Sequence, residues 1–229
     1  NYDPDTAREG YGEALEVLIE GMTHEKLSYS GKHFNYTDVP MELRPLQDPH
    51  PPLWYPSSNP DGSKYAGENG FHYCTLGPVE AAKTNIAAFR DAYAKRGSTA
   101  GARRPFPGGA AVGISRQVTV AETDAEALKI AGPAYKVWHD SLTKLWRENN
   151  VEGPAFARNT VDTVEKAIAG GAHVAGSPET VREQLAEQIE ALGVNYMVIA
   201  FNIGDMAHED ALRSITLFGE EVMPKLADL

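Results

Sequence analysis

The chain has 229 residues, a formal net charge of −11 and 42% hydrophobic side chains, enough apolar material for the core of an α/β domain. The negative charge leaves no basic surface for nucleic acid or an anionic membrane, so neither is expected as a partner. A single cysteine, Cys74, excludes an internal disulfide and suits a reducing, cytoplasmic location. No apolar run reaches the roughly 20 residues that span a bilayer, and no signal peptide is recognisable.

The N-terminal segment predicts an amphipathic helix. Its apolar residues recur at the helical spacing, and they are Ala7, Tyr11, Ala14, Leu15, Leu18, Ile19 and Met22. Residues 23–52 are rich in Tyr, His and Pro and are interpreted as an irregular excursion. Since the helical pattern is established by Ala7 and the first residue is not Met, we expect this sequence to begin in the middle of a fold.

The rest of the chain alternates predicted strands with predicted helices. The strand candidates are residues 52–56, 71–75, 111–121 and 195–202. Thr123 and Glu126 form a capping box that opens a helix, and we expect Gly132 and Pro133 to interrupt it. Ser177 opens a further helix that a glycine ends at position 193. The last helix is expected to bury Leu212, Ile215, Phe218 and Val222.

This order of elements predicts one α/β domain over residues 1–229 with a parallel sheet. Two architectures remain open. A small doubly wound open sheet needs four or five strands, and a (β/α)8 barrel needs eight, so these strands would form half of a barrel. Periodicity alone does not choose between them.

The segment SSNPDGSKYAGENG, residues 57–70, is the most informative stretch. Asn59 suits a helix N-cap, Pro60 the first helical position and Gly70 the left-handed end of the helix. The turn gathers backbone N–H groups and serine hydroxyls above the end of a strand, where α/β proteins bind phosphate. An ordinary capped strand–helix turn explains the same residues, and the carboxylate of Asp61 opposes a phosphate unless it points away.

The histidines and Arg116 are further candidates for site residues. The seven histidines show no HExxH motif and no close pair at ligand spacing, so no metal site is predicted. Arg116 shares the even-numbered face of its strand with Val112, Ile114, Val118 and Val120, which predicts that it points into the barrel. A snorkelling or salt-bridged arginine is the favoured interpretation there, and an anion-binding role is the alternative.

Five motifs in register carry a family resemblance. They are QDPHPPLW (47–54), the turn of residues 57–70, QVTVAETDAEA (117–127), AGSPETV (175–181) and FGEEVMP (218–224). Together they resemble the second half of the bacterial luciferase-like family of flavin-dependent monooxygenases and oxidoreductases. The resemblance implies a (β/α)8 barrel whose strands five to eight are present here, while the first four are missing. It also makes residues 122–176 a helical insertion or lid, in which Trp138 and Trp146 are expected in the core, with an aromatic wall over the substrate as the less favoured alternative.

The resemblance implies roles for individual residues. The family's phosphate loop is carried onto Ser57, Ser58, Asn59, Gly62 and Ser63. Tyr73 and Thr75 are expected at the edge of the flavin ring. Phe201 and Asn202, with Arg116, are expected to face the substrate pocket. No catalytic residue is predicted, because the family's acid–base residues lie mostly in the missing half.

The function implied by this resemblance is that of an FMN-linked monooxygenase, using reduced FMN (FMNH2) and O2 on a small organic substrate, with a flavin reductase as a possible partner. One alternative is a deazaflavin (F420)-dependent dehydrogenase of the same superfamily. Another is a non-catalytic relative that binds flavin or pairs with a partner. Because a half barrel has two open sheet edges, we expect a homo-oligomer or association with the missing amino-terminal half.

Overall fold

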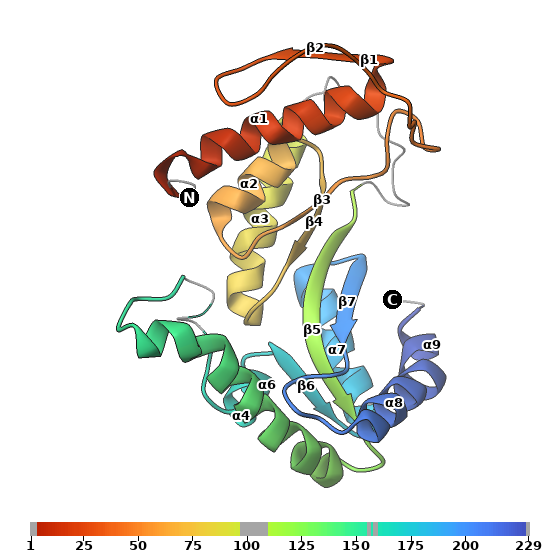
Figure 1. Ribbon diagram of the computed structural model, residues 1–229. Helices are drawn as coiled ribbons and strands as arrows, with labels where there is room; N and C mark the ends of the chain where they lie inside the picture. Colours follow the sequence, from red (N-terminus) through yellow and green to blue (C-terminus); the bar gives the residue numbers. More distant parts are fainter. Residues whose placement is uncertain (1–3, 97–109, 155–156, 158–159, 228–229) are drawn as a thin grey trace. The chain divides into compact units, whose positions relative to one another are not determined.

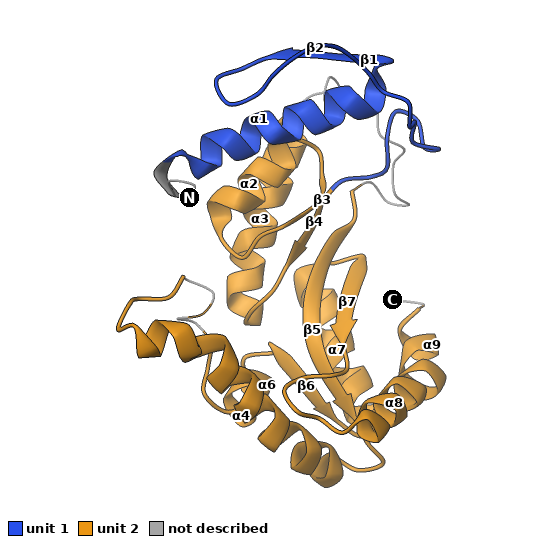
Figure 2. Ribbon diagram, in the orientation of Figure 1, with its two compact units in different colours: residues 1–53 blue, residues 54–229 orange. Residues whose placement is uncertain are grey.

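The computed structural model describes residues 4–96, 110–154, 157 and 160–227. These residues group into two compact units, Asn1–Leu53 and Trp54–Leu229 (Figure 2). The sequence predicted one domain over residues 1–229, whereas the structure separates the N-terminal helix and the following arm from the rest. Each unit is described by itself.

The first unit contains the predicted helix α1 (Pro4–Thr23) and an unexpected β-hairpin. Strand β1 (Lys26–Ser30) pairs antiparallel with β2 (Asn35–Pro40). The expectation of an irregular arm over residues 23–52 was therefore wrong for residues 26–40, whereas residues 41–52 contain no helix or strand. The carboxylate of Glu13 on α1 accepts the backbone N–H groups of Lys32, His33 and Phe34 at 2.8, 2.7 and 3.1 Å. One acidic side chain therefore satisfies the open amides of the hairpin turn.

The second unit is built on a five-stranded parallel sheet (Figure 1). Its strands are β3 (Trp54–Pro56), β4 (His72–Thr75), β5 (Val112–Val120), β6 (His173–Gly176) and β7 (Tyr196–Ala200). The predicted strands are confirmed by β3, β4, β5 and β7. β6 was not predicted and lies inside residues 122–176, the segment expected to be a helical insertion.

Strand β5 is the partner of three other strands. Its residues Gly113 and Ile114 pair with both β4 and β7, so these two strands lie on opposite edges of β5. Gln117 pairs with both His173 of β6 and Ala200 of β7. β6 therefore extends the same edge as β4, further along β5. Leaving β6 aside, β3, β4, β5 and β7 are neighbours in chain order, as in a barrel, whereas a doubly wound sheet reverses its strand order at a switch point.

Most helices of this unit begin at a capping residue or end at a residue that favours a helix end. They are α2 (Pro60–Glu68), α3 (Val79–Lys95), α4 (Asp124–Glu148), α6 (Val164–Ala169), α7 (Pro178–Leu192), α8 (His208–Leu217), the π-helical turn η1 (Phe218–Val222) and α9 (Met223–Leu226). The Thr123 hydroxyl accepts the Glu126 N–H at 3.2 Å, which confirms the predicted cap. Gly193, at φ +59°, ends α7 as predicted.

Two predictions about helices were wrong. α4 continues through Pro133, although a proline inside a helix removes one backbone hydrogen bond and crowds a carbonyl of the preceding turn. Residues of α4 on both sides of Pro133, Ala131 and Ala134 among them, pack in one core cluster, which holds the helix together. In the C-terminal helical segment Phe218 and Val222 are buried, but Leu212 and Ile215 are 49% and 46% exposed.

The hydrophobic core lies between the sheet and its helices. One cluster joins Tyr73 and Ile114 to Ile86 and Phe89 of α3, and another joins Val118 and Val120 to α7 and η1. The opposite face of β7 is open, since Tyr196 and Val198 are 39% and 44% exposed. The sequence of β7 is apolar on both faces, which predicted that helices cover both faces of this strand. In the described structure, only the face toward the helices is covered.

Candidate functional site

A cavity of about 330 Å³ lies at the carboxyl ends of the parallel strands. Four of the five strands contribute to it: Ser58 follows β3, Leu76 and Gly77 follow β4, Ser115 and Gln117 belong to β5, and Ala200 ends β7. Ala172, which also lines the cavity, lies at the amino end of β6. Tyr135, Trp138, Val161 and Ala167 add an apolar wall. In α/β proteins with parallel strands this end of the sheet is where ligands bind.

The turn after β3 is organised by hydrogen bonds among its own residues. Asn59 caps α2 by accepting the Gly62 N–H at 2.9 Å, as predicted, and its backbone N–H donates to the Ser57 hydroxyl oxygen at 3.3 Å. The Ser63 hydroxyl donates to the Asn59 carbonyl at 2.7 Å. Of the predicted phosphate loop, Ser57, Asn59, Gly62 and Ser63 therefore use polar groups to shape the turn.

Ser58 is the member of this turn that lines the cavity. Among the described residues, neither its backbone N–H nor its hydroxyl has a protein partner. A Cβ on Gly62 would collide with the Ser57 hydroxyl, so glycine is required for this tight turn. Asp61 is exposed and lines a different hollow, between α2 and α3, and its carboxylate is therefore not among the cavity groups.

Tyr73 supports the turn from below instead of facing the cavity. Its hydroxyl lies 2.9 Å from the Ser57 carbonyl and 2.6 Å from the Ser63 hydroxyl, and its ring stacks on Phe89 at 4.8 Å. Burial is the main cause of its raised pKa. Thr75 points to the same helix layer, where Asn85 donates to its hydroxyl at 3.4 Å. The structure thus places both side chains away from the cavity edge expected for them.

Arg116 also lies on the helix side of the sheet, which corrects its predicted direction into the barrel. The even-numbered residues of β5 pack on helices, and Arg116 is 1% exposed among them. Its Nε donates to Gln188 of α7 at 2.6 Å, and its Nη1 donates to the carbonyls of Gly77 and Ser115 at 3.0 and 2.8 Å. Burial lowers its pKa to about 10. The guanidinium therefore ties β5 and the β4–α3 turn to α7.

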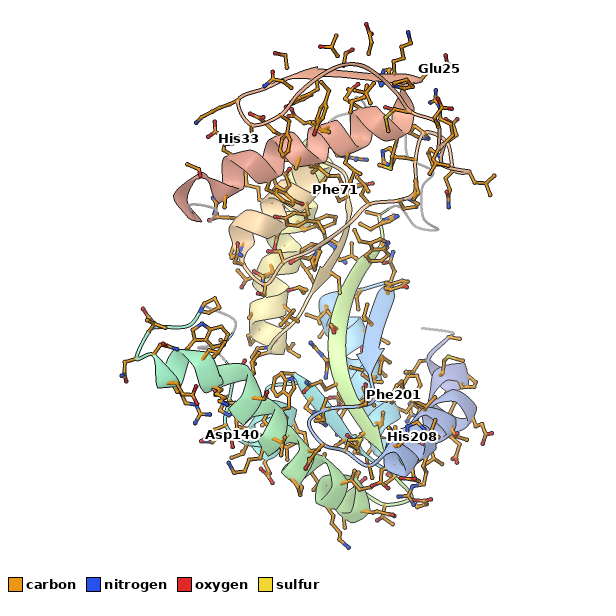
Figure 3. All side chains as sticks on the ribbon, in the orientation of Figure 1. Glu25, His33, Phe71, Asp140, Phe201 and His208 are labelled. Atoms are coloured by element: carbon orange, nitrogen blue, oxygen red, sulfur yellow. The ribbon has the colours of Figure 1, made fainter. Side chains whose placement is uncertain are left out.

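The same alternation moves Phe201 out of the predicted pocket. The ring of Phe201, labelled in Figure 3, packs on Phe218 at 5.2 Å between centroids, toward the helices. Ala200 takes the cavity-facing position at the end of β7. Asn202 is exposed and is not among the lining residues.

The odd-numbered face of β5 supplies polar groups that the sequence analysis missed. Ser115 and Gln117 line the cavity. Behind Gln117 lies His173, 1% exposed, whose Nδ1 is 3.4 Å from Gln117 Oε1 and whose Nε2 is 3.3 Å from Thr119 Oγ1. Burial lowers the pKa of His173 to about 4, so its imidazole is neutral at pH 7. The small and polar residues at alternate positions of β5 were the signal that could have revealed this face.

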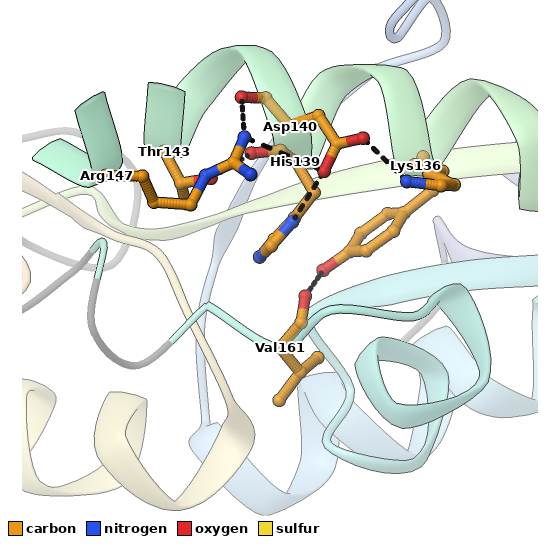
Figure 4. A network of polar contacts seen from close by, with 7 residues as sticks. Lys136, His139, Asp140, Thr143, Arg147 and Val161 are labelled. Atoms are coloured by element: carbon orange, nitrogen blue, oxygen red, sulfur yellow. Dashed lines mark hydrogen bonds and ion pairs between the residues drawn. The ribbon is translucent and has the colours of Figure 1, made fainter. Parts of the chain in front are cut away.

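Helix α4 closes one side of the cavity with aromatic rings. The ring centroids of Tyr135 and Trp138 lie 5.2 Å apart, and the Tyr135 hydroxyl donates to the Val161 carbonyl at 2.8 Å. Trp138 is thus part of an aromatic wall, whereas Trp146 is not among the lining residues. On the outer side of α4, Asp140 bonds Lys136 at 2.6 Å and its carbonyl accepts from Arg147 at 2.9 Å (Figure 4). These contacts are exposed and contribute little to stability.

The loop after β7 is held against α4 at Gly204. This residue has φ +53°, and a Cβ there would collide with the Ala134 carbonyl. Glycine is therefore needed for the close approach of the two backbones. The contact lies in the turn of α4 next to Tyr135, so the end of β7 and the aromatic wall are fixed together.

The chemistry of the lining residues suits a largely apolar ligand that carries hydrogen-bond acceptors. Ser58, Ser115 and Gln117 supply donors, Lys166 is the charged lining residue, and no carboxylate is among the described residues around the cavity. In the part of the chain that the structure describes, no cluster of His, Cys, Asp and Glu could hold a metal ion. No described helix is long and apolar enough to cross a membrane.

Several known proteins are similar to this chain in sequence or fold. The chain is 30% identical over 224 residues to the uncharacterized protein y4wF of Sinorhizobium fredii, covering 98% of this chain and 63% of that protein. It thus spans less than two thirds of that relative's length.

Three solved structures share the fold at low sequence identity. Monooxygenase RslO1 from Streptomyces bottropensis has a TM-score of 0.75 at 21% identity, covering 98% of this chain and 63% of that one. The oxygenating constituent of 3,6-diketocamphane monooxygenase from Pseudomonas putida, in complex with FMN, has a TM-score of 0.70 at 20% identity (96% and 63% covered). An F420-dependent secondary alcohol dehydrogenase has a TM-score of 0.67 at 16% identity (100% and 64% covered).

These likenesses and the strand order favour the barrel over the doubly wound sheet. The sequence model of the luciferase-like monooxygenases matches residues 1–196, which is most of the chain. The five motifs of the sequence had indicated the same relationship. The chain belongs to the luciferase-like monooxygenase family.

Proposed function

We propose that this chain is the carboxyl-terminal half of an FMN-linked monooxygenase and that its cavity receives part of the flavin and the substrate. The observation that supports this most directly is the cavity at the strand ends, with the donors of Ser58, which have no partner among the described residues, at one point and apolar walls around it. When bound, reduced FMN would supply two electrons, so that one atom of O2 enters the organic substrate and the other leaves as water.

The residues present fit such a cofactor in three respects. Ser58 offers an amide and a hydroxyl near the N-terminus of α2, which favours an anion. Among the described lining residues Lys166 is charged and none is a carboxylate. The Lys166 ammonium pairs with Asp162 at 2.7 Å, so the lining itself holds no negative charge that opposes a phosphate. Tyr135 and Trp138 exclude water from the side of the cavity where a substrate would lie.

The proposed division of work follows from these positions. Ser58 would bind the phosphate, while Ser57, Asn59, Ser63 and Tyr73 hold the turn in shape through the contacts described above. A small, largely apolar substrate is the class that the walls would accept. A flavin reductase would supply the reduced cofactor, and the remaining strands of the barrel would come from an amino-terminal segment or a second chain.

A dehydrogenase that uses F420 is the second candidate, because the F420-dependent alcohol dehydrogenase shares this fold. A non-catalytic flavin-binding or partner-pairing relative is the third, since the chain spans 63% of y4wF. Absorption spectra of the purified chain titrated with FMN and with F420 separate the first two candidates, and turnover of reduced FMN and O2 with an organic substrate separates the first from the third. The monooxygenase proposal expects FMN to bind with its spectrum perturbed, and binding of F420 alone, or of neither, contradicts it.

The phosphate site is tested by Ser58→Asp. The added negative charge should weaken FMN binding at least about tenfold, or ~1.4 kcal/mol, while riboflavin, which lacks the phosphate, should respond far less. Thr123→Asp is the matched control, because it adds the same charge at another helix start and keeps a good N-cap residue. Equal weakening of FMN and riboflavin by Ser58→Asp, or an unchanged FMN affinity, contradicts the assignment.

A further inference from the structure

Gln117, His173 and Thr119 form a polar chain on the inner face of the sheet. The register of β5 and β6 sets Gln117 opposite His173. The two ring nitrogens of His173 reach different partners, Gln117 Oε1 at 3.4 Å and Thr119 Oγ1 at 3.3 Å. Thr119 and His173 are each 1% exposed, so water does not compete for these contacts.

The hydrogen-bond partners of His173 favour one arrangement of the protons in this polar chain. The acceptor that the structure offers the Thr119 hydroxyl among the described residues is Nε2 of His173. If Nε2 carried the proton, the Thr119 O–H would be a buried donor without an acceptor, which costs about 1–3 kcal/mol. The Thr119 hydroxyl therefore donates to Nε2, and Nδ1 carries the proton of the neutral imidazole.

The Nδ1–H tautomer in turn sets the direction of the Gln117 amide. Nδ1–H donates to Oε1, so the carbonyl end of the amide is turned to His173. The amide nitrogen, with two N–H donors, is left at the cavity, and it has no protein acceptor among the described residues. The hydroxyl of Ser115, the next residue on the same face, is likewise without a partner in the described structure.

We propose that Gln117 binds a carbonyl oxygen of the ligand in the cavity, and that His173 is a positioning residue that keeps the amide nitrogen of Gln117 facing this ligand. The proposal rests on the proposed function only in taking the cavity as the ligand site. The carbonyl group could belong to the flavin ring or to an organic substrate, and both offer the same acceptor to an N–H donor.

The first measurement uses the chain without ligand. The ¹⁵N chemical shifts of His173 at pH 7 should show a protonated Nδ1 and an unprotonated Nε2. Thr119→Val removes the hydroxyl donor and should let the second tautomer appear. A predominant Nε2–H tautomer in the unchanged chain overturns the proposal, because Nδ1 would then accept from the Gln117 amide and turn its carbonyl to the cavity.

The second measurement uses cyclohexanone as a carbonyl probe and methylcyclohexane as its control without oxygen. Cyclohexanone should shift the Gln117 side-chain N–H resonances, and methylcyclohexane should not. Gln117→Leu keeps a side chain of similar size without the amide and should weaken cyclohexanone binding about three- to tenfold, as expected for one hydrogen bond.

Substitutions of His173 separate positioning from packing. His173→Phe should weaken cyclohexanone binding as much as Gln117→Leu, and the double variant should be no weaker. His173→Asn should keep most of the affinity, because its amide N–H can donate from a position close to that of Nδ1. Additive losses, or equal losses in the Phe and Asn variants, overturn the positioning role, and the Asn variant decides the matter even where the Phe variant is unstable.

Titrations with FMN and with riboflavin show whether the carbonyl group belongs to the flavin ring or to the substrate. If the flavin ring supplies the carbonyl, both should shift the Gln117 resonances, and Gln117→Leu should weaken both by the same factor. If the substrate supplies it, cyclohexanone alone should respond. A chain that binds neither flavin contradicts the proposed function, while the tautomer and the cyclohexanone titration still decide the role of Gln117.

Discussion

Lowering the pH from 7 to 4 should destabilise this chain more than a His173→Asn variant, whose side chain at this position does not titrate. Burial lowers the pKa of His173 from 6.5 to about 4 in the folded chain, whereas the unfolded chain keeps the ordinary value. Between these two values the unfolded chain binds a proton that the folded chain does not, so folding stability falls as the pH falls. The contribution is fully present above pH 6.5 and is lost by pH 4.

The magnitude follows from the same two values. At 1.36 kcal/mol per pH unit the loss is ~3 kcal/mol between pH 7 and pH 4, a large part of the stability of a domain of this size. Urea unfolding followed by tryptophan fluorescence at several pH values measures it. Carboxylates also titrate in this range, but they do so in both proteins, and the difference between the two curves isolates His173. Parallel curves for the two proteins would show that His173 is solvated or protonated in the folded chain and would refute the reasoning.

Three further predictions concern the turn and the backbone contacts around the cavity. Tyr73→Phe removes the hydroxyl under Ser57 and should lower the free energy of unfolding, measured with urea, by about 1–3 kcal/mol. A weaker FMN affinity should follow as a secondary effect. An unchanged stability would contradict the supporting role of the hydroxyl. Asn59→Ala removes the cap of α2 and should cost about 0.5–2 kcal/mol, while a loss below this range would mean that the turn holds without its cap. Gly204→Ala should destabilise the chain by more than about 1 kcal/mol in thermal unfolding. The new Cβ would collide with the Ala134 carbonyl, and the φ of residue 204 is positive, which alanine disfavours. A neutral result would show that this loop can move away from α4.

Features that depend on neighbouring residues could be predicted from the sequence. The caps at Asn59 and Thr123 and the helix end at Gly193 are examples, because each is decided within one turn of helix by a side-chain oxygen or a left-handed backbone. The four predicted strands were found for a similar reason, since their apolar runs are bounded by turn residues. The family and its fold class followed from motifs spread along the whole chain.

Features that depend on which face is covered could not be predicted in the same way. Alternation shows that Arg116 and Val118 share a face, but it does not say whether this face meets the helices or the cavity. The same ambiguity placed Tyr73 and Phe201 at the cavity and left Ser115 and Gln117 unnoticed. β6 escaped prediction because Val174 is the one typical strand former among its four residues, and β2 because all of its residues are exposed.

The position of β5 has a consequence for how the second unit comes apart. Every interstrand ladder of its sheet except that between β3 and β4 includes β5, and these ladders join residues far apart in the chain, such as Gly113 and Tyr196. Detaching β5 would leave β6 and β7 without any strand partner among the described residues. The amides of β5 should therefore exchange with solvent only when the whole sheet opens, and the sheet should behave as one cooperative unit in which no strand pair beyond β3 and β4 outlasts the others.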